Sequence, residues 1–337
     1  MAAKLGCAMK KNKEKDFKTT IGGQAIIEGI MMRGPQKTAI VVRGPEGLVT
    51  KVEDTVSPKK KYPILGWLFI RGVINFVLSM KIGMSALNYS ASFFPEGEDE
   101  DGADAEPSKF DKWLEEKLGS KRVEKLVIGF ALVLGIILAL GLFVLLPTFL
   151  GSLLVPVLGT GFLRKLAETV IRLILLLGYM ILVSLTKDIK RVFSYHGAEH
   201  KSIACYEADT ELTVENVKSF SRMHPRCGTS FLLTVVIISL VVFLLIQAIF
   251  SELAWSNFFL RVGINLAMLP FVVAISYELN QLVGKHDNFL TRFLRAPGLW
   301  MQKITTREPD DSMIEVGIEA IRLVIPEQKG EDEWGNE

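Results

Sequence analysis

Cysteine and histidine are scarce in this chain of 337 residues, which contains three cysteines and four histidines. The cysteines, Cys7, Cys205 and Cys227, are too few and too scattered for the disulfide framework of a small secreted domain. We also expect no cleavable secretory signal, because the first apolar cluster follows a lysine-rich stretch and is interrupted by charges. These shortages leave few residues that can carry soft-ligand or thiol chemistry.

Long apolar runs, in contrast, are abundant. Uncharged apolar runs of about 18 residues or more point to membrane spans, since a helix rises about 1.5 Å per residue and a bilayer core is about 30 Å thick. Four regions fit this description, at about 126–150, 169–185, 231–250 and 259–283. The sequence therefore predicts an all-α integral membrane protein with about four transmembrane helices, and it excludes a purely soluble globular protein.

Positive charge sets the expected orientation. Lysine and arginine crowd the segment 186–228, the stretch before the first span and the stretch after the fourth, whereas the other two connections carry only Arg164, Lys165 and Arg261. Because cytoplasmic loops are enriched in lysine and arginine, we expect a plasma-membrane protein with both termini and the central loop in the cytoplasm. Arg172, inside the second span, lies close enough to its end to snorkel.

The apolar stretch 62–94 is ambiguous. Arg71 and Lys81 interrupt it, and burying such a charge in a bilayer costs roughly 2.5–3.5 kcal/mol. A crossing here would also put the basic segment before Leu126 on the wrong side of the membrane. We therefore expect an interfacial or re-entrant segment, with a fifth crossing as the alternative.

The remaining segments are polar. Residues 1–20 are predicted to form a disordered basic tail, and 95–125 an acidic linker followed by a basic helix. The region 21–61 is glycine-rich, and within it 38–55 predicts a β-hairpin around Gly44–Gly47. In the C-terminal region 284–337, the residues 305–325 predict an amphipathic helix that begins near Asp310 and covers another element.

Three of the four histidines lie in the predicted central loop 186–228. On a helix, His196 and His200 would project from one face and could share one metal ion, with Glu199 beside them. His-x-x-Glu-His is the inverted form of a zinc-hydrolase motif, in which the glutamate handles the proton of a water that zinc makes acidic, with a pKa of about 7. His224 and Cys227 follow, and imidazole together with thiolate suits zinc.

This cluster allows three interpretations. Three protein ligands with Glu199 as general base would make a catalytic zinc site, whereas four ligands, His196, His200, His224 and Cys227, would close the coordination shell and make a structural site. In the third interpretation Cys227 is a free thiol nucleophile activated by His224.

Two further acidic residues are candidates for the same site. Glu278 lies about one turn from the end of the fourth span, where it could be an additional metal ligand, pair with Arg226 or Lys285, or simply face water. The segment 22–35 is glycine-rich but lacks the Gly-Lys-Ser/Thr ending of a phosphate loop. It predicts either a tight turn with an ion pair between Glu28 and Arg33, or a contribution of Gln24 or Glu28 to the histidine site.

The chain resembles the YqhQ-like family, which comprises bacterial multi-pass membrane proteins of unknown function described as predicted metal-dependent enzymes. The matching segments run in order along nearly the whole chain after residue 20: Gly22–Pro35, Tyr195–Lys201, His224–Phe231, Tyr277–Glu278 and Thr305–Asp311. The resemblance implies a membrane-bound, metal-dependent protein, and it supplies neither a substrate nor assigned ligands.

Taken together, the sequence favours a metal-dependent hydrolase at the cytoplasmic membrane face, with Zn²⁺ or another divalent metal as cofactor and a peptide or a lipid as substrate. The rival is a non-catalytic membrane protein with a structural zinc site. A transporter is less favoured, because the predicted spans hold few ionisable groups. The expected partner is the lipid bilayer, with no nucleic acid, and the sequence does not indicate an oligomeric state.

Overall fold

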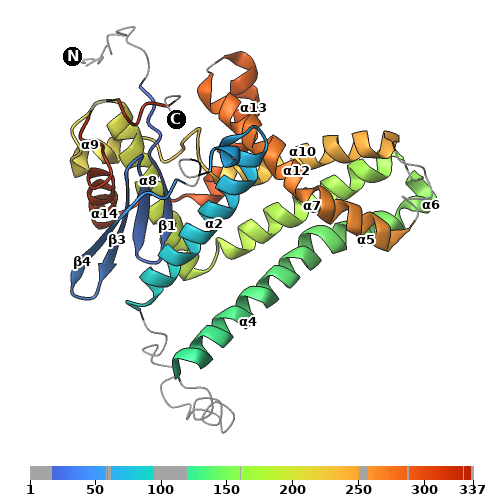
Figure 1. The fold of residues 1–337 in the computed structure, drawn as a ribbon, viewed down its shortest axis with the longest axis horizontal. Coiled ribbons are helices and arrows are strands. Elements are labelled where there is room, and N and C mark those ends of the chain that lie inside the picture. The colour runs from blue at the N-terminus through green and yellow to red at the C-terminus, as the bar shows by residue number, and fades with distance from the viewer. Residues whose placement is uncertain are drawn as a thin grey trace, which may run out of the picture.

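The computed structural model describes residues 17–57, 59, 62–94, 120–159, 161–249, 257–286, 288–328 and 330–334. Apart from its last residues, the predicted basic tail lies outside these ranges, and so does nearly all of the predicted linker 95–125. The described chain forms two parts (Figure 1). One contains a small sheet and is called the sheet lobe, and the other consists of helices and is called the helical lobe.

The sheet has four antiparallel strands in the order β1-β2-β3-β4. Their bounds are β1 Gly22–Ile26, β2 Gly29–Arg33, β3 Lys37–Gly44 and β4 Gly47–Asp54. β3 and β4 form the hairpin predicted from the sequence, and Gly44 pairs with Gly47 across the turn. The glycine-rich segment before them adds a second hairpin, so the predicted N-terminal β region is larger than expected.

Both faces of the sheet are covered. Alternate residues of β2 and β3, such as Ile30 and Val41, pack against α8 (Lys187–Glu207) and α14 (Asp311–Arg322), while α9 (Val214–Ser219) closes the side. The other residues, such as Ile40, pack against α2 (Ile70–Ala91). These strands, α8, α9 and α14 make up the sheet lobe, and its apolar core holds α8 in place.

The predicted C-terminal helix is confirmed as α14. Asp310 caps its first turn by accepting a hydrogen bond from the Met313 N–H at 2.9 Å. Ile314, Ile318 and Ile321 face the core, as the spacing of three and four residues predicted. The two ends of the described chain also meet, because Thr19 forms an isolated β-bridge with Glu333.

The helical lobe extends away from the sheet, with α6 near its far end (Figure 1). It comprises the 3-10 helix η1 (Pro63–Gly66), α2, α4 (Ser120–Leu140), the π-helix η2 (Gly141–Leu145), α5 (Leu146–Leu153), α6 (Val155–Leu158), α7 (Phe162–Val183), α10 (Thr229–Ile249), α12 (Phe258–Lys285) and α13 (Phe289–Thr305). Within the described residues, four helices are long and apolar enough to cross a membrane: Ile70–Ala91, Gly129–Leu153, Phe162–Val183 and Phe258–Lys285. α10 covers the remaining predicted span, and its described side chains form a shorter apolar stretch, Phe231–Phe243.

The beginning of α7 corrects the sequence analysis. The connection expected to hold Arg164 and Lys165 is helical, and both side chains are almost completely buried, at 1% and 2% exposure. Lys165 donates to Glu168 at 2.9 Å, and Gly151 of α5 leaves the room that Glu168 occupies. A hydropathy pattern scores each charge separately, so it cannot show that Glu168 pairs with these cations inside the lobe.

The stretch 62–94 contains one continuous helix, α2, which is itself among the four candidate spans. One end of α2 packs on α12, where Asn75 donates to the Tyr277 hydroxyl at 2.8 Å. The other end packs on the sheet, and Gly83 gives room to the Gln24 side chain. α2 therefore lies between the two lobes.

Candidate metal centre

The His-Gly-Ala-Glu-His segment lies on α8, and the helical spacing expected for it is present. The rings of His196 and His200 lie next to each other, with centroids 4.4 Å apart. His200 is buried and His196 is half-buried. The two imidazoles therefore share one face of α8, as two ligands of a single ion would.

Both histidines use Nδ1 for hydrogen bonds to backbone carbonyls. His196 Nδ1 lies 2.8 Å from the Thr305 carbonyl oxygen, and His200 Nδ1 lies 2.6 Å from the Arg222 carbonyl oxygen. A carbonyl only accepts, so each Nδ1 carries a proton, and Nε2 is the nitrogen of each ring that would bind a metal. Metal-binding histidines are typically oriented in this way.

Cys227 completes the group. Its Sγ lies 3.3 Å from His196 Nε2, and the Thr229 N–H donates to the same sulfur. Among the described residues, His196, His200 and Cys227 form the cluster whose ligand atoms all lie within 4.8 Å of one another. Two imidazoles and a thiolate are a donor set that suits zinc, so these residues fit the expected metal.

Gly197 allows this arrangement. A Cβ at this position would lie 2.0 Å from the Arg307 carbonyl oxygen, so only glycine lets the segment 305–309 run so close to α8. The Arg307 N–H donates to the Phe193 carbonyl at 2.8 Å and fixes that approach. The glycine in the motif therefore brings the Thr305 carbonyl to His196.

Glu199 points to the sheet side of α8 and is buried. Its Oε1 accepts a hydrogen bond from the Gly23 N–H of β1 at 3.1 Å, while its buried Oε2 has no hydrogen-bond partner among the described residues. Burial raises the pKa of Glu199 above its ordinary value, against the opposing effects of His196 and the Gly23 N–H. The carboxyl group thus has one oxygen anchored by protein and the other unsatisfied.

His224 lies beside the cluster but faces another group. Its Nε2 lies 3.3 Å from Glu207 Oε2, and Glu207 also binds Arg226. Burial holds the pKa of His224 below its usual range in spite of Glu207, so the ring is neutral and donates through Nε2. The structure therefore brings Cys227, rather than His224, to the two histidines of α8.

The loop that carries His224 and Cys227 is tied to α13 by one side chain. Gln302 Oε1 accepts from the His224 N–H at 2.8 Å, and Gln302 Nε2 donates to the His224 carbonyl at 2.8 Å. Gln302 is fully buried. α13 was not among the helices predicted from the sequence, although its start carries a recognisable capping box of Asn288 and Thr291.

Glu278 is engaged elsewhere. Arg71 Nε of α2 donates to Glu278 Oε1 at 2.7 Å, and a second nitrogen of Arg71 contacts Oε2. The structure thus gives Glu278 a bidentate ion pair with a residue that the sequence analysis did not consider as its partner.

Glu28 is also engaged in an ion pair. It occupies the β1–β2 turn with φ of 47°, a conformation that costs a non-glycine residue about 1 kcal/mol. Its carboxylate accepts from Arg191 and, at 3.1 Å, from the Tyr195 hydroxyl, both on α8. Gln24 lies against α2 instead. The β1–β2 hairpin therefore contributes the Gly23 N–H, and not these two side chains, to the surroundings of Glu199.

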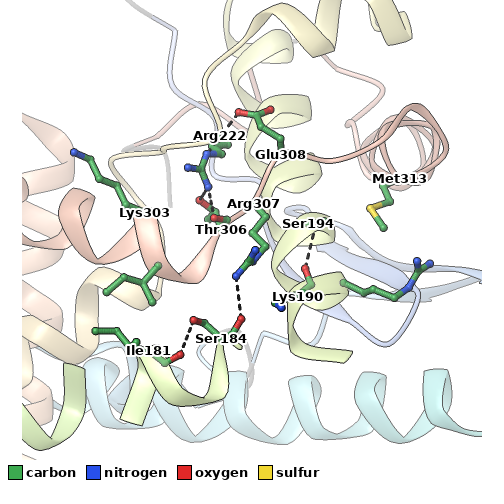
Figure 2. A pocket seen from close by; sticks show the side chains of 12 residues that line it. Ile181, Ser184, Lys190, Ser194, Arg222, Lys303, Thr306, Arg307, Glu308 and Met313 are labelled. Atoms are coloured by element: carbon green, nitrogen blue, oxygen red, sulfur yellow. Dashed lines mark hydrogen bonds and ion pairs between the residues drawn. The ribbon is translucent and has the colours of Figure 1, made fainter. Parts of the chain in front are cut away.

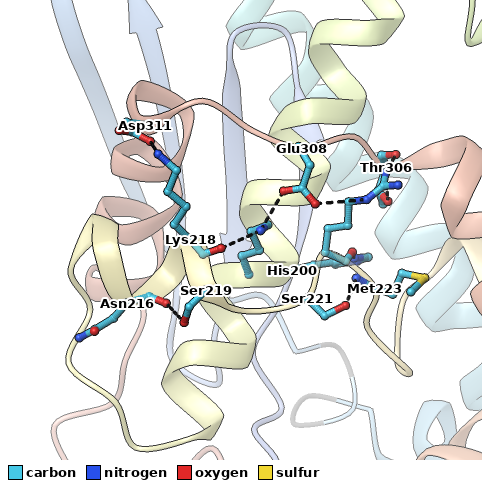
Figure 3. A network of polar contacts seen from close by, with 11 residues as sticks. His200, Asn216, Lys218, Ser219, Ser221, Met223, Thr306, Glu308 and Asp311 are labelled. Atoms are coloured by element: carbon cyan, nitrogen blue, oxygen red, sulfur yellow. Dashed lines mark hydrogen bonds and ion pairs between the residues drawn. The ribbon is translucent and has the colours of Figure 1, made fainter. Parts of the chain in front are cut away.

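A network of charges holds the outer side of the site (Figure 3). Lys201 Nζ binds Glu308 at 2.9 Å and the Lys218 carbonyl at 3.0 Å, and Arg222 lies on the other side of Glu308. These contacts fix the Arg222 carbonyl that orients His200. No sequence pattern could have identified the Arg222 and Thr305 carbonyls, because every residue has a carbonyl and only the fold selects these two.

In the part of the chain that the structure describes, the fold and the site define a mostly helical protein with four helices long enough and apolar enough to span a membrane, a small antiparallel sheet and a compact His/Cys cluster. A family model described as protein of unknown function DUF1385 matches residues 67–327, and the chain belongs to this family. The chain is 37% identical over 311 residues to the uncharacterized protein YqhQ of Bacillus subtilis (strain 168), covering 90% of this chain and 92% of that protein. This confirms the expected family, while the metal-dependent activity described for it stays a prediction. No solved structure matches the chain.

Proposed function

We propose that this protein is a membrane-bound, metal-dependent hydrolase whose metal is held by His196, His200 and Cys227 at the cytoplasmic membrane face. The observation that carries the proposal is the convergence of two imidazole rings and one thiol, with both Nδ1 atoms fixed by carbonyls. Three protein ligands leave a fourth position open, which is typical of catalytic rather than structural zinc sites.

Zn²⁺ bound there would supply a Lewis acid and lower the pKa of water toward about 7. The chain's own residues provide the rest of the chemistry. Glu199, one helical turn from His196, is anchored through one oxygen and has a second oxygen available to accept or return a proton. A structural zinc site is the second candidate, and the burial of His200 and Glu199 favours it.

The fold supports the proposed orientation by a parity argument. The sheet, α8 and α14 share one core, so they lie on the same side of any membrane. The chain leaves this core after β4, returns at α8, leaves again before α10 and returns at α14. Each excursion must therefore cross the membrane an even number of times.

The first excursion contains three candidate spans, of which one must stay outside the bilayer. α2 has the lowest mean hydropathy, 1.3 against 2.9 for residues 129–153 and 2.1 for α7, and it packs against the sheet. It is thus best suited to lie along the membrane surface. The second excursion crosses through α10 and α12. This gives four crossings with the sheet, α8 and α14 on one side, and the distribution of positive charge favours the cytoplasm as that side.

Metal analysis by elemental mass spectrometry of the detergent-purified full-length protein tests the proposal. We expect about one zinc per chain in the wild type, none in His196→Ala/His200→Ala, and unchanged zinc in His286→Ala, which removes an exposed histidine at the end of α12. If the site is catalytic, the Glu199→Gln protein should keep its zinc and lose its function in cells. If the site is structural, this variant should keep both its zinc and its function. Wild-type protein without stoichiometric metal would overturn the proposal.

A further inference from the structure

A cavity of about 770 Å³ lies next to the metal centre, where the end of α7, the start of α8, the end of α13 and the segment 306–308 meet (Figure 2). Its volume falls within the range of about 300–1,000 Å³ that is typical of ligand sites. Arg222 and Thr306 line it, and the Arg222 carbonyl orients His200. The cavity therefore shares a wall with the proposed metal site.

The lining is strongly basic. Five cationic side chains face one carboxylate, that of Glu308; the cations are Lys190, Arg191, Arg222, Lys303 and Arg307. Arg191 is neutralised by Glu28 and Arg222 by Glu308. Positive charge consequently exceeds negative charge even after these two pairs are counted.

The other three cations are available to a ligand. Arg307 reaches from its segment to the Ser184 carbonyl at 3.0 Å, with Lys190 and Lys303 on either side of it in Figure 2. The buried Nε of Arg307 has no hydrogen-bond partner among the described residues. Within the same part of the chain, no ion pair engages the ammonium groups of Lys190 and Lys303.

The cavity also borders an apolar surface. Ile181 lines it from the last turn of α7, and the neighbouring Leu182 and Leu185 are exposed, at 68% and 59%. Since α7 is a candidate span, this border is where a bilayer headgroup region would lie if the proposed topology holds. Basic groups beside an apolar helix end suit a ligand with an anionic head and a hydrocarbon chain.

We infer that this cavity binds the phosphate group of the protein's substrate, so that the hydrolase acts on a phosphate-bearing compound. Arginine and lysine are the side chains that proteins use for phosphate, through charge-assisted hydrogen bonds. The statement that the bound compound is hydrolysed rests on the proposed function, whereas phosphate binding in the cavity does not require the metal. The source of the phosphate is either a lipid headgroup or a free phosphate compound, and the exposed apolar residues of α7 favour the lipid.

The test uses full-length protein in detergent and two probes. Native mass spectrometry compares retention of dioleoyl phosphatidic acid with that of dioleoylglycerol, which has the same chains and no phosphate, and calorimetry measures the affinity for inorganic phosphate. The variant is Lys190→Ala/Lys303→Ala. The control is Lys187→Ala/Lys285→Ala, which removes the same charge from exposed positions outside the cavity.

We expect the wild type to prefer phosphatidic acid, the cavity variant to lose about tenfold or more in affinity, and the control to stay within about twofold of the wild type. All three should have the same melting temperature, because neither double substitution removes a described ion pair. If the cavity variant loses affinity for the lipid only, the phosphate that the cavity binds belongs to a lipid headgroup. If it loses affinity equally for inorganic phosphate, the cavity recognises the phosphate alone. Equal losses in both variants, or no preference in the wild type, would overturn the inference.

The same measurements separate this inference from the proposed function. His196→Ala/His200→Ala should keep the phosphate preference while losing zinc. Wild-type protein that prefers phosphatidic acid but holds no metal would support phosphate binding in the cavity and overturn the proposed metal-dependent hydrolase. Protein with stoichiometric zinc and no phosphate preference would support the metal site and overturn phosphate binding in the cavity.

Discussion

The sheet lobe and the helical lobe bury opposite kinds of side chain. In the sheet lobe the interior is apolar, with Ile30, Val41 and Ile321 completely buried. In the helical lobe large apolar side chains such as Ile174, which is 63% exposed, lie outside, while Arg164 and Glu168 lie inside. A chain that folds against water buries apolar surface, so the reversed pattern indicates that the helical lobe is built for an apolar surrounding.

The two lobes therefore hold their polar groups by different means. In the helical lobe the buried charge of Lys165 is held by side chains, because its ammonium group pairs with Glu168 and lies over the Phe243 ring at 4.4 Å. The histidines of α8, in contrast, are held by backbone carbonyls: His196 by that of Thr305 at the end of α13, and His200 by that of Arg222 in the loop after α9. Packing of α8 of the sheet lobe against these neighbours is thus a condition for the metal centre.

The most severe test of this dependence is Gly197→Ala. The new methyl group would meet the Arg307 carbonyl at 2.0 Å, so the segment 305–309 must move away from α8. We expect a loss of about 4 kcal/mol or more in stability and loss of bound metal, measured by thermal unfolding in detergent and by metal analysis.

Gly178→Ala in α7 is the matched control, since a Cβ there meets nothing within 4 Å. It should leave both properties unchanged. A stable, metal-loaded Gly197→Ala protein would show that the close approach of the 305–309 segment is not needed.

The apolar exterior of the helical lobe is tested by Ile174→Asp near the middle of α7. If this face contacts lipid, the charge costs roughly 2.5–3.5 kcal/mol of insertion free energy, and the carbonate-resistant membrane fraction should fall sharply. Leu48→Asp, at an exposed apolar position on β4, should have little effect. Equal behaviour of the two variants would contradict the contrast between the lobes.

The smallest expected effect concerns the start of α14. Asp310→Ala removes the cap and should cost about 1 kcal/mol of sheet-lobe stability at neutral pH. Burial pushes the pKa of Asp310 upward, but hydrogen bonds from Ser312 and the Met313 N–H outweigh it and hold the pKa below its ordinary value. The cap is therefore fully effective above that ordinary value and is lost as pH falls through the lowered pKa.

Thermal unfolding of wild type and Asp310→Ala across pH 2–8 checks this direction. The two curves should converge in acid. A difference that persists at the lowest pH would assign the effect of the substitution to helix propensity or packing instead of the charged cap.

The sequence predicted the elements whose signals are local. The hairpin of β3 and β4 has a turn motif, α14 has a cap and a regular apolar spacing, and His196 and His200 share a face on any helix. Each of these patterns is complete within about 20 residues, and each prediction of local structure is confirmed.

What the sequence could not predict depends on contacts between distant segments. Arg164 looks like a loop residue until Glu168 and the neighbouring helices surround it. The choice between Cys227 and His224 beside the α8 histidines is decided by Glu207, which engages His224. The basic cavity combines residues from α7, α8, α13, α14, the loop that carries Arg222 and the segment 306–308, so no single segment reveals it.

The double hydrogen bond of Gln302 has a mechanical consequence. Because one amide both donates to and accepts from the His224 backbone, the loop leading to Cys227 cannot shift relative to α13 without breaking two buried bonds. α13 in turn exposes the large aromatic side chains Phe289, Phe293 and Trp300, and tryptophan is enriched at bilayer surfaces. The loop and α13 therefore move together. A change in the depth of α13 at the bilayer surface would displace the sulfur of Cys227 relative to the two imidazoles.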